Sequence, residues 1–181
     1  NCPMHFYNFK FFCFIDYFNK NLINNLSNNV SIIYRNYSVK DHLKDIIKIK
    51  EICKKKKLKF YLSNDVKLAI KLNLDGAYIP SFNNNLNFNA FNLKKRFILL
   101  GSAHSLKEIR IKEKQKVKYI FLSPLFESKK YNKNLGIFRF INLKKLTKKN
   151  VVPLGGIKQT NLKIVKNLNI YNVASISLFN K

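Results

Sequence analysis

The sequence predicts an α/β fold in which eight parallel strands close into a (β/α)8 TIM barrel, with the last helix short or missing. Short apolar runs rich in β-branched and aromatic residues alternate with helical patterns along the chain. The runs are almost equally spaced, and polar residues follow nearly every one of them. We count eight strands and seven helical patterns, and a doubly wound open sheet is the competing architecture.

Each expected strand is a short run rich in Phe, Tyr, Ile or Val that stops at polar or turn-forming residues. The first run closes at Asp16, the second at Arg35 and the third at Asn64-Asp65. Asp75-Gly76 opens the fourth. In chain order, the expected strands cover residues 9–16, 30–35, 58–63, 75–80, 96–100 and 117–122, a run opened by Val151, and residues 170–179.

Helices are expected where apolar residues recur at a spacing of three and four. A capping box, Ser38-x-x-Asp41, predicts the start of a helix whose last turn carries the basic run 54–57, where cations suit the helix dipole. Thr160 is expected to cap the last helix. The Asn-rich residues 81–92 are expected to form an irregular loop. The other expected helices cover residues 17–26, 66–72, 106–116, 138–149 and 160–168.

Length and composition predict one domain, 1–181, because 181 residues suit a single core. A hydrophobic content of 46% excludes general disorder. The net charge of +26 raises the question of nucleic-acid binding, but only four of the 35 basic residues are arginine. Proteins that bind bases favour Arg and aromatic platforms, so solvated surface lysines are favoured over a nucleic-acid partner, which stays as a third alternative motivated by net charge alone. The positive field should still attract small anions.

The three cysteines are an odd number without C-x-x-C spacing, so neither a disulfide framework nor a zinc site is indicated. This pattern fits a reducing compartment, and we expect a cytoplasmic protein. The apolar residues 6–18 are interrupted by Lys10 and Asp16 and are too short to span a bilayer, so no membrane partner is expected. The oligomeric state stays open.

The segment Val151–Ile157 combines a buried strand pattern with a Gly155-Gly156 turn. The following strand pattern ends in Ser175 and Ser177. Glycines and small hydroxyls at adjacent strand ends expose backbone N–H groups, which bind phosphate well. The alternative at Gly-Gly is a bare strand-to-helix turn.

Polar residues that follow parallel strands gather at one rim of a barrel. There, Arg35 and one loop lysine could hold a second anionic group, and Asp65 could bind Mg²⁺. The alternatives are that Asp65 caps a helix, that His104 is an ordinary helix-start histidine and that the loop lysines are solvated. The expected rim contains Asp16, Arg35, Asn64, Asp65, Ser102, His104, Ser128, Lys129, Lys130, Gly155, Gly156, Ser175 and Ser177.

A series of short motifs, in order over essentially the whole chain, resembles the thiamine phosphate synthase family and its relative TenI. The motifs are Ile15-Asp16, Tyr34-Arg35, Ser63-Asn64-Asp65, Asp75-Gly76-Ala77-Tyr78-Ile79, Ser102-Ala103-His104-Ser105, Ser123-Pro124-Leu125-Phe126-Glu127-Ser128, Leu135-Gly136, Leu154-Gly155-Gly156-Ile157 and Val173-Ala174-Ser175-Ile176-Ser177. The resemblance implies a barrel that joins hydroxymethylpyrimidine diphosphate to a thiazole phosphate and releases diphosphate.

The resemblance also implies residue roles. Arg35, Asn64 and a loop lysine, assigned as Lys130, would hold diphosphate, and Ser102 would lie near the leaving group. Asp65 would bind Mg²⁺ as cofactor. The phosphorylated substrates, a pyrimidine diphosphate and a thiazole phosphate, would be bound by Tyr34, His104, Ser128, Lys129, Gly155, Gly156, Ser175 and Ser177.

Four positions depart from the family pattern. Tyr37 replaces a phosphate-binding lysine, and Asn83 stands where a second metal-binding aspartate is expected. The loop Ser128-Lys129-Lys130-Tyr131 leaves the register of its lysine open. Pro124 replaces the TenI histidine, which disfavours tautomerase activity. We therefore expect a synthase-like transferase, with a non-catalytic or regulatory phosphate-binding barrel as the alternative.

Overall fold

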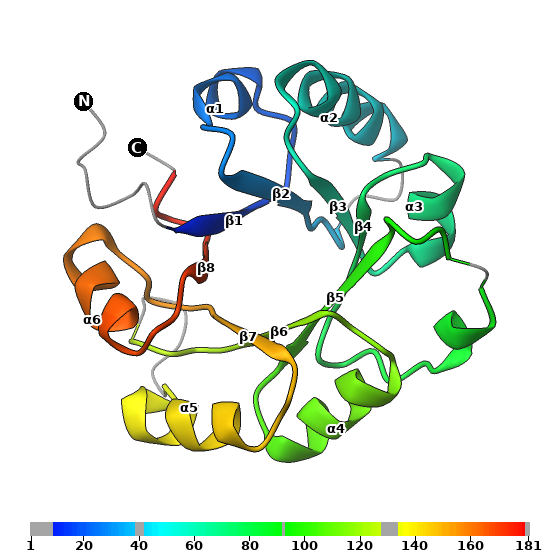
Figure 1. The fold of residues 1–181 in the computed structure, drawn as a ribbon. Helices are drawn as coiled ribbons and strands as arrows, with labels where there is room; N and C mark the ends of the chain where they lie inside the picture. The colour runs from blue at the N-terminus through cyan, green and yellow to red at the C-terminus, as the bar shows by residue number, and fades with distance from the viewer. Residues whose placement is uncertain (1–8, 39–41, 92, 128–133, 180–181) are drawn as a thin grey trace.

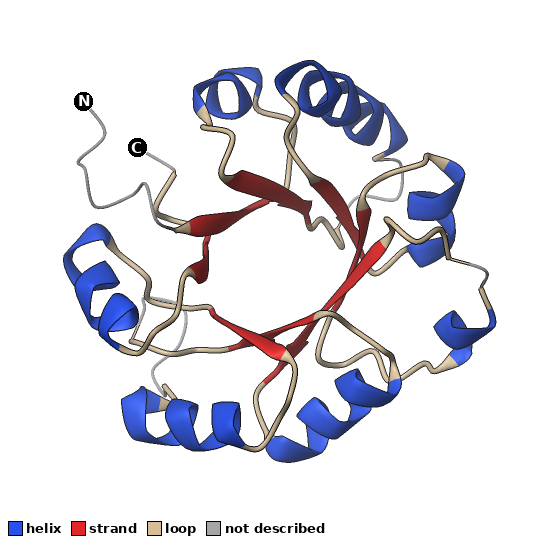
Figure 2. Ribbon diagram, viewed as in Figure 1, coloured by secondary structure: helices blue, strands red, loops and turns tan. Residues whose placement is uncertain are grey.

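The computed structural model describes residues 9–38, 42–91, 93–127 and 134–179. Eight parallel strands form one sheet in the order β7-β6-β5-β4-β3-β2-β1-β8, and the helices lie around its outside (Figures 1 and 2). The strands are β1 (Lys10–Ile15), β2 (Val30–Tyr34), β3 (Phe60–Ser63), β4 (Gly76–Ile79), β5 (Ile98–Ala103), β6 (Tyr119–Leu122), β7 (Asn150–Pro153) and β8 (Asn172–Ser175).

The sheet curves until its two edge strands, β7 and β8, meet. Strand β1 pairs with β2 on one side and with β8 on the other, so the first and last strands are neighbours. Between β7 and β8 the described residues form a single parallel bridge, from Leu154 to Ala174. The sheet is therefore a nearly closed barrel, and the prediction of a (β/α)8 fold is confirmed.

Helices occupy most of the connections between strands. They are α1 (Lys20–Asn25), α2 (Leu43–Lys56), α3 (Val66–Lys71), α4 (Leu106–Lys114), α5 (Gly136–Lys145) and α6 (Leu162–Asn167), with short 3₁₀ turns at η2 (Asn87–Ala90) and η3 (Gln159–Asn161). The described residues contain six α-helices, one fewer than the seven helical patterns counted from the sequence. The described part of the β4–β5 connection contains only η2, in the segment expected to be an irregular loop. Residues 176–179, after β8, form no helix.

Several predicted boundaries were wrong for local reasons. The residue that caps α2 is His42, which makes no capping hydrogen bond through its side chain, so helix α2 does not begin at Ser38. Thr160 lies inside the 3₁₀ turn η3 and caps nothing. Strand β5 continues through Ser102 to Ala103, so Ser102 is part of the strand and does not follow it.

Two layers of apolar side chains make the core. The outer layer lies between the sheet and the helices, and the inner layer fills the barrel. Aromatic rings dominate the inner layer: Phe121 lies 5.0 Å from Phe12 and 5.4 Å from Tyr78, centroid to centroid. Such edge-on ring pairs pack tightly. The barrel is thus a filled core whose upper surface forms the floor of the site.

None of the helices in the described ranges has both the length and the apolar character needed to cross a membrane.

Candidate functional site

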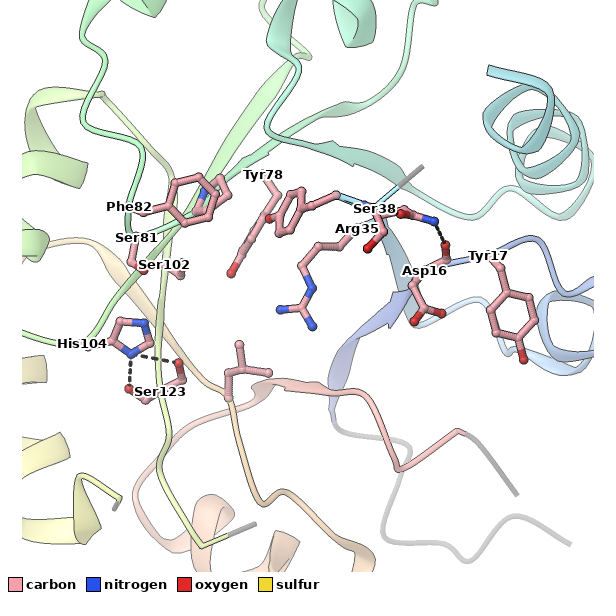
Figure 3. Close-up of a pocket in the computed structure, with 14 residues that line it drawn as sticks. Asp16, Tyr17, Arg35, Ser38, Tyr78, Ser81, Phe82, Ser102, His104 and Ser123 are labelled. Atoms are coloured by element: carbon pink, nitrogen blue, oxygen red, sulfur yellow. Dashed lines mark hydrogen bonds between the residues drawn. The ribbon is translucent and has the colours of Figure 1, made fainter. Parts of the chain in front are cut away.

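A cavity of about 580 Å³ opens at the carboxyl ends of the strands, above the aromatic floor. Most of its walls are polar side chains from the segments that follow β1, β2, β4, β5 and β6 (Figure 3). The lining residues are Asp16, Tyr17, Arg35, Asn36, Tyr37, Ser38, Tyr78, Pro80, Ser81, Phe82, Ser102, His104, Ser123 and Leu154. Parallel barrels place their binding sites at this end, as the sequence predicted.

Arg35 projects into the cavity from the end of β2 (Figure 3). Its direction follows from strand alternation: Ile33 belongs to the inner layer and Tyr34 to the outer one, so the next side chain points inward. The guanidinium carbon lies 5.0 Å from the centroid of the Phe14 ring, a cation–π contact. Among the described residues, no carboxylate pairs with Arg35. The cavity therefore contains a fixed cation whose N–H donors remain available to an anion.

The same alternation corrects the prediction for Tyr34. Its side chain is buried in the outer layer, and its ring lies 5.9 Å from that of His42. Tyr34 does not line the cavity and does not face a substrate there.

Ser102, His104 and Ser123 form the wall opposite Arg35 (Figure 3). The Nδ1 atom of His104 lies 2.6 Å from the carbonyl oxygen of Ser123 and 3.3 Å from its hydroxyl oxygen. Because a carbonyl oxygen only accepts, Nδ1 carries the proton, and in the neutral ring Nε2 is an acceptor. The backbone N–H of His104 also donates to Glu108 at 2.6 Å. His104 is therefore both held at a helix start and exposed to the cavity.

Two aromatic side chains border the cavity on its solvent side. Tyr37 and Phe82 are 52% and 65% exposed, and their rings meet edge-on with centroids 5.8 Å apart. The Tyr37 hydroxyl lies 2.8 Å from that of Ser63, so either oxygen can donate. Burial raises the pKa of Tyr37, while the Ser63 hydrogen bond and the Arg35 charge partly offset the rise. The phenol is thus neutral near pH 7, where the family pattern has a lysine.

Asn64 and Asp65 lie outside the cavity lining. Asn64 has a positive φ of 63°, and its side-chain oxygen accepts a hydrogen bond from Asn83 at 2.7 Å. Asp65 caps α3, because its Oδ1 accepts from the Leu68 N–H at 2.8 Å. The helix-cap alternative for Asp65 is therefore what the structure shows. The described residues contain no group of three His, Cys, Asp or Glu side chains that could hold a metal ion.

The Gly155-Gly156 turn packs against the segment after β6. Gly155 and Gly156 have φ values of +91° and +66°, and a Cβ on Gly156 would lie 2.6 Å from the carbonyl oxygens of Phe126 and Glu127. Close packing is thus one reason for glycine at position 156. Neither the Gly156 nor the Ser177 amide donates to another residue that the structure describes. Neither residue lines the cavity described above.

Ser175 joins the turns after β7 and β8. Its buried hydroxyl donates to the carbonyl of Ile157 at 3.2 Å and accepts from the Leu178 N–H at 3.1 Å. Both hydrogen-bonding functions of the hydroxyl are engaged, so the side chain of Ser175 shapes the two turns. Ser177, two residues later, is exposed.

The residues of the expected rim therefore fall into three groups. Asp16, Arg35, Ser102 and His104 surround one cavity. Six others lie at or after the ends of β3, β7 and β8 and do not line that cavity: Asn64, Asp65, Gly155, Gly156, Ser175 and Ser177. Ser128, Lys129 and Lys130 lie outside the described residues.

Site prediction from the sequence missed most of the cavity lining, including Tyr37, Tyr78, Phe82 and Ser123. Position was a usable signal for two of them, because Ser123 follows β6 directly and Tyr37 follows β2 by three residues. Tyr78 belongs to the inner aromatic layer, and its strand pattern gives no sign that it reaches the cavity. Phe82 lies in the Asn-rich segment, which shows no periodicity.

Comparison with known proteins identifies the family. A family model for thiamine monophosphate synthase, TMP-TENI, matches residues 20–179. A thiamine-phosphate synthase of Prochlorococcus marinus is 31% identical over 142 residues, which cover 76% of this chain and 40% of that protein. One from Pelagibacter ubique is 31% identical over 134 residues, covering 72% and 63%.

A solved structure supports the fold independently. Thiamine phosphate pyrophosphorylase from Pyrococcus furiosus matches with a TM-score of 0.74 at 17% identity, over 94% of this chain and 86% of that one. The matched part of the chain spans about two fifths of the Prochlorococcus relative's length. The match to the family model runs from α1 to the turn after β8. The chain belongs to the thiamine monophosphate synthase family, TMP-TENI.

Proposed function

We propose that the chain joins hydroxymethylpyrimidine diphosphate to thiazole phosphate and releases diphosphate, giving thiamine phosphate. In this reaction the thiazole nitrogen forms a bond to the pyrimidine methylene carbon. The bond from that carbon to the diphosphate oxygen breaks, and the electron pair leaves with diphosphate. Family membership supports the reaction class, and the observation that carries the proposal is Arg35, a cation in the cavity that pairs with no carboxylate of the described residues.

The chemistry requires the departing diphosphate to be stabilised as its charge develops. Arg35 suits that role, because a guanidinium can bind two phosphate oxygens at once and Phe14 limits its movement from one side. Ser102 and Ser123 offer hydroxyl groups, and His104 offers Nε2, on the facing wall. We assign the leaving group to this cavity, with a lysine of the Ser128–Lys130 loop as a further contact.

The thiazole phosphate is assigned to the turns after β7 and β8. The support is that the N–H groups of Gly156 and Ser177 donate to no described residue, and that the Ser175 hydroxyl bonds to both turns. Backbone N–H groups at such turns bind phosphate without any charged side chain. The two phosphorylated substrates would then approach the barrel mouth from neighbouring strand ends.

We propose that Mg²⁺ binds only together with diphosphate. The described residues supply no metal cage, and one oxygen of Asp65 is used to cap α3. Magnesium commonly binds through one or two carboxylates plus substrate phosphates, and the other Asp65 oxygen can supply one such ligand. A bound ion would neutralise charge on the leaving diphosphate. A cytosolic location is proposed as well, supported by the free, buried thiols of Cys13 and Cys53.

Turnover tests the function directly. Purified protein with Mg²⁺, hydroxymethylpyrimidine diphosphate and thiazole phosphate should give thiamine phosphate and diphosphate in equal amounts. An Arg35→Met variant should lose most of this activity, whereas Arg110→Met should retain it, because Arg110 pairs with Glu113 on the outside of α4. Absence of product from correctly folded protein would overturn the proposal.

A second candidate is a phosphate-ligand-binding barrel that does not catalyse. The observation in its favour is how the two replaced positions are used. The Tyr37 side chain is hydrogen-bonded to Ser63 and the Asn83 side chain to Asn64. At both replaced positions the polar side chain therefore bonds to another residue of the chain. Saturable binding of thiazole phosphate without any product would select this candidate.

A further inference from the structure

A lysine is buried behind the cavity, on the inner face of α4. Lys112 is 0% exposed. Its Nζ donates to the backbone carbonyl of Pro80 at 2.7 Å, to that of Asn83 at 2.8 Å and to Gln115 Oε1 at 2.9 Å. An ammonium has three N–H donors, so all three are satisfied. A buried charge without such partners would strongly destabilise the fold, so this arrangement is a specific one.

Gln115, one turn further along the chain, completes the arrangement. It is also 0% exposed, and its Nε2 donates to the carbonyls of Asn83 at 2.9 Å and Asn85 at 2.8 Å. Together the two side chains bind three backbone carbonyls of one short segment, residues 80–85. That segment has no regular secondary structure, so these bonds replace the hydrogen bonds of a helix or strand.

The opposite side of the same segment forms part of the cavity wall. Pro80, Ser81 and Phe82 line the cavity, and Figure 3 shows Ser81 and Phe82 there. The Phe82 ring meets the Tyr37 ring edge-on, with centroids 5.8 Å apart. The Asn83 side chain bonds to Asn64, at the end of β3. Lys112 and Gln115 therefore hold residues 80–85 from the side of α4, while residues 80–82 face the cavity.

The stem of Lys112 also fits its surroundings closely. A Cβ on Gly101 would lie 2.8 Å from Lys112 Cδ, so a larger residue in β5 would displace the stem. Gly101 directly precedes Ser102, which lines the cavity. Burial lowers the pKa of Lys112 to about 8, and the charge of Glu108 partly offsets that effect. The amine therefore still carries its proton at pH 7.

We propose that Lys112 and Gln115 are positioning residues that fix the segment 80–85 as a wall of the ligand cavity. Neither side chain lines the cavity, so both act through the backbone carbonyls they bind. The effect on the segment is independent of the reaction. The effect on ligand binding rests on the proposed function, because it assumes that a diphosphate occupies this cavity.

The experiment compares Lys112→Met with Lys107→Met in the full chain. Methionine has nearly the length of lysine but no donors, and Lys107 is an exposed lysine on the same helix. Hydrogen–deuterium exchange should be at least tenfold faster for peptides covering residues 80–91 in Lys112→Met. Exchange in β6 and α5 should stay unchanged, and Lys107→Met should match wild type throughout. Methylammonium added to a Lys112→Ala variant should restore slow exchange.

The second readout is the affinity for inorganic pyrophosphate, measured by calorimetry. Lys112→Met should weaken it about tenfold or more, because a displaced wall misplaces the groups that contact the ligand. If Lys112→Met does not fold, Gln115→Met tests the same segment and leaves the ammonium with two carbonyl partners. The inference is overturned if exchange in residues 80–91 does not rise in the folded variant. Faster exchange with unchanged pyrophosphate affinity would overturn the link to the site. Wild-type protein that does not bind pyrophosphate would instead contradict the proposed function.

Discussion

The substitution Gly156→Ala measures how tightly the Gly-Gly turn packs against the segment after β6. The added Cβ would lie 2.6 Å from two carbonyl oxygens, those of Phe126 and Glu127, in a residue whose φ is +66°. Gly136 is a matched control, because its φ is +68° but the nearest atom to an added Cβ is 3.7 Å away. The backbone penalty is therefore common to both variants, and the crowding is specific to Gly156.

The magnitudes follow from these two effects. Placing alanine at positive φ costs about 1–2 kcal/mol, which is the whole loss expected for Gly136→Ala. Crowding adds about 1–3 kcal/mol for Gly156→Ala. For a chain of this size the added loss lowers Tm by a further 2–12 °C or so.

Urea unfolding of both variants, together with calorimetric titration of thiazole phosphate, provides the assay. Gly156→Ala should be less stable than Gly136→Ala and should bind thiazole phosphate more weakly. Equal stability losses would refute the packing argument. Gly156→Val is a poorer probe of the phosphate site, because its side chain would collide with the same carbonyls before any ligand is bound.

Three further predictions concern single side chains. Arg35→Met should weaken pyrophosphate binding about 10- to 100-fold in a titration, because charged hydrogen bonds are lost; Arg110→Met should bind as wild type does. Asp65→Asn should keep the α3 cap and change the free energy of unfolding by less than about 0.5 kcal/mol, whereas Asp65→Ala should cost about 1 kcal/mol. A fall in Mg²⁺-dependent turnover in Asp65→Asn would then show that Asp65 binds Mg²⁺, and unchanged turnover would exclude that role. Burial lowers the pKa of Lys112 to about 8, so the folded chain loses this proton at a lower pH than the unfolded chain does, and this group makes the free energy of unfolding rise with pH above about 8. Urea unfolding between pH 7.5 and 10 should show a flatter dependence of that free energy on pH in Lys112→Met than in wild type. Parallel pH profiles in the two proteins would contradict the shift.

The barrel could be predicted from sequence because its strands carry a strong local signal. Runs such as Tyr119–Leu122 are apolar or aromatic on both faces, as buried parallel strands must be, and end where polar residues begin. The direction of Arg35 follows from the same alternation once the strand is placed. Helix starts were harder, because His42 caps α2 without a side-chain hydrogen bond and so leaves no capping motif.

The residues that sequence reasoning missed depend on contacts between distant segments. Lys112 lies in a charged helix, and its burial follows from a loop some thirty residues away that supplies the carbonyl acceptors. Only its spacing of three from the buried Ile109 hinted at an inward position. The role of Tyr34 came only from the resemblance of the Tyr34-Arg35 motif, whereas neighbouring side chains of a strand point to opposite faces and Tyr34 lies in the outer layer.

A crystal structure of the protein with thiazole phosphate and pyrophosphate bound would test the account most directly. We predict pyrophosphate oxygens within hydrogen-bonding distance of the Arg35 guanidinium, and the thiazole phosphate on the Gly156 and Ser177 amides. Phosphate groups bound elsewhere on this lysine-rich surface, with the barrel mouth left to solvent, would contradict it.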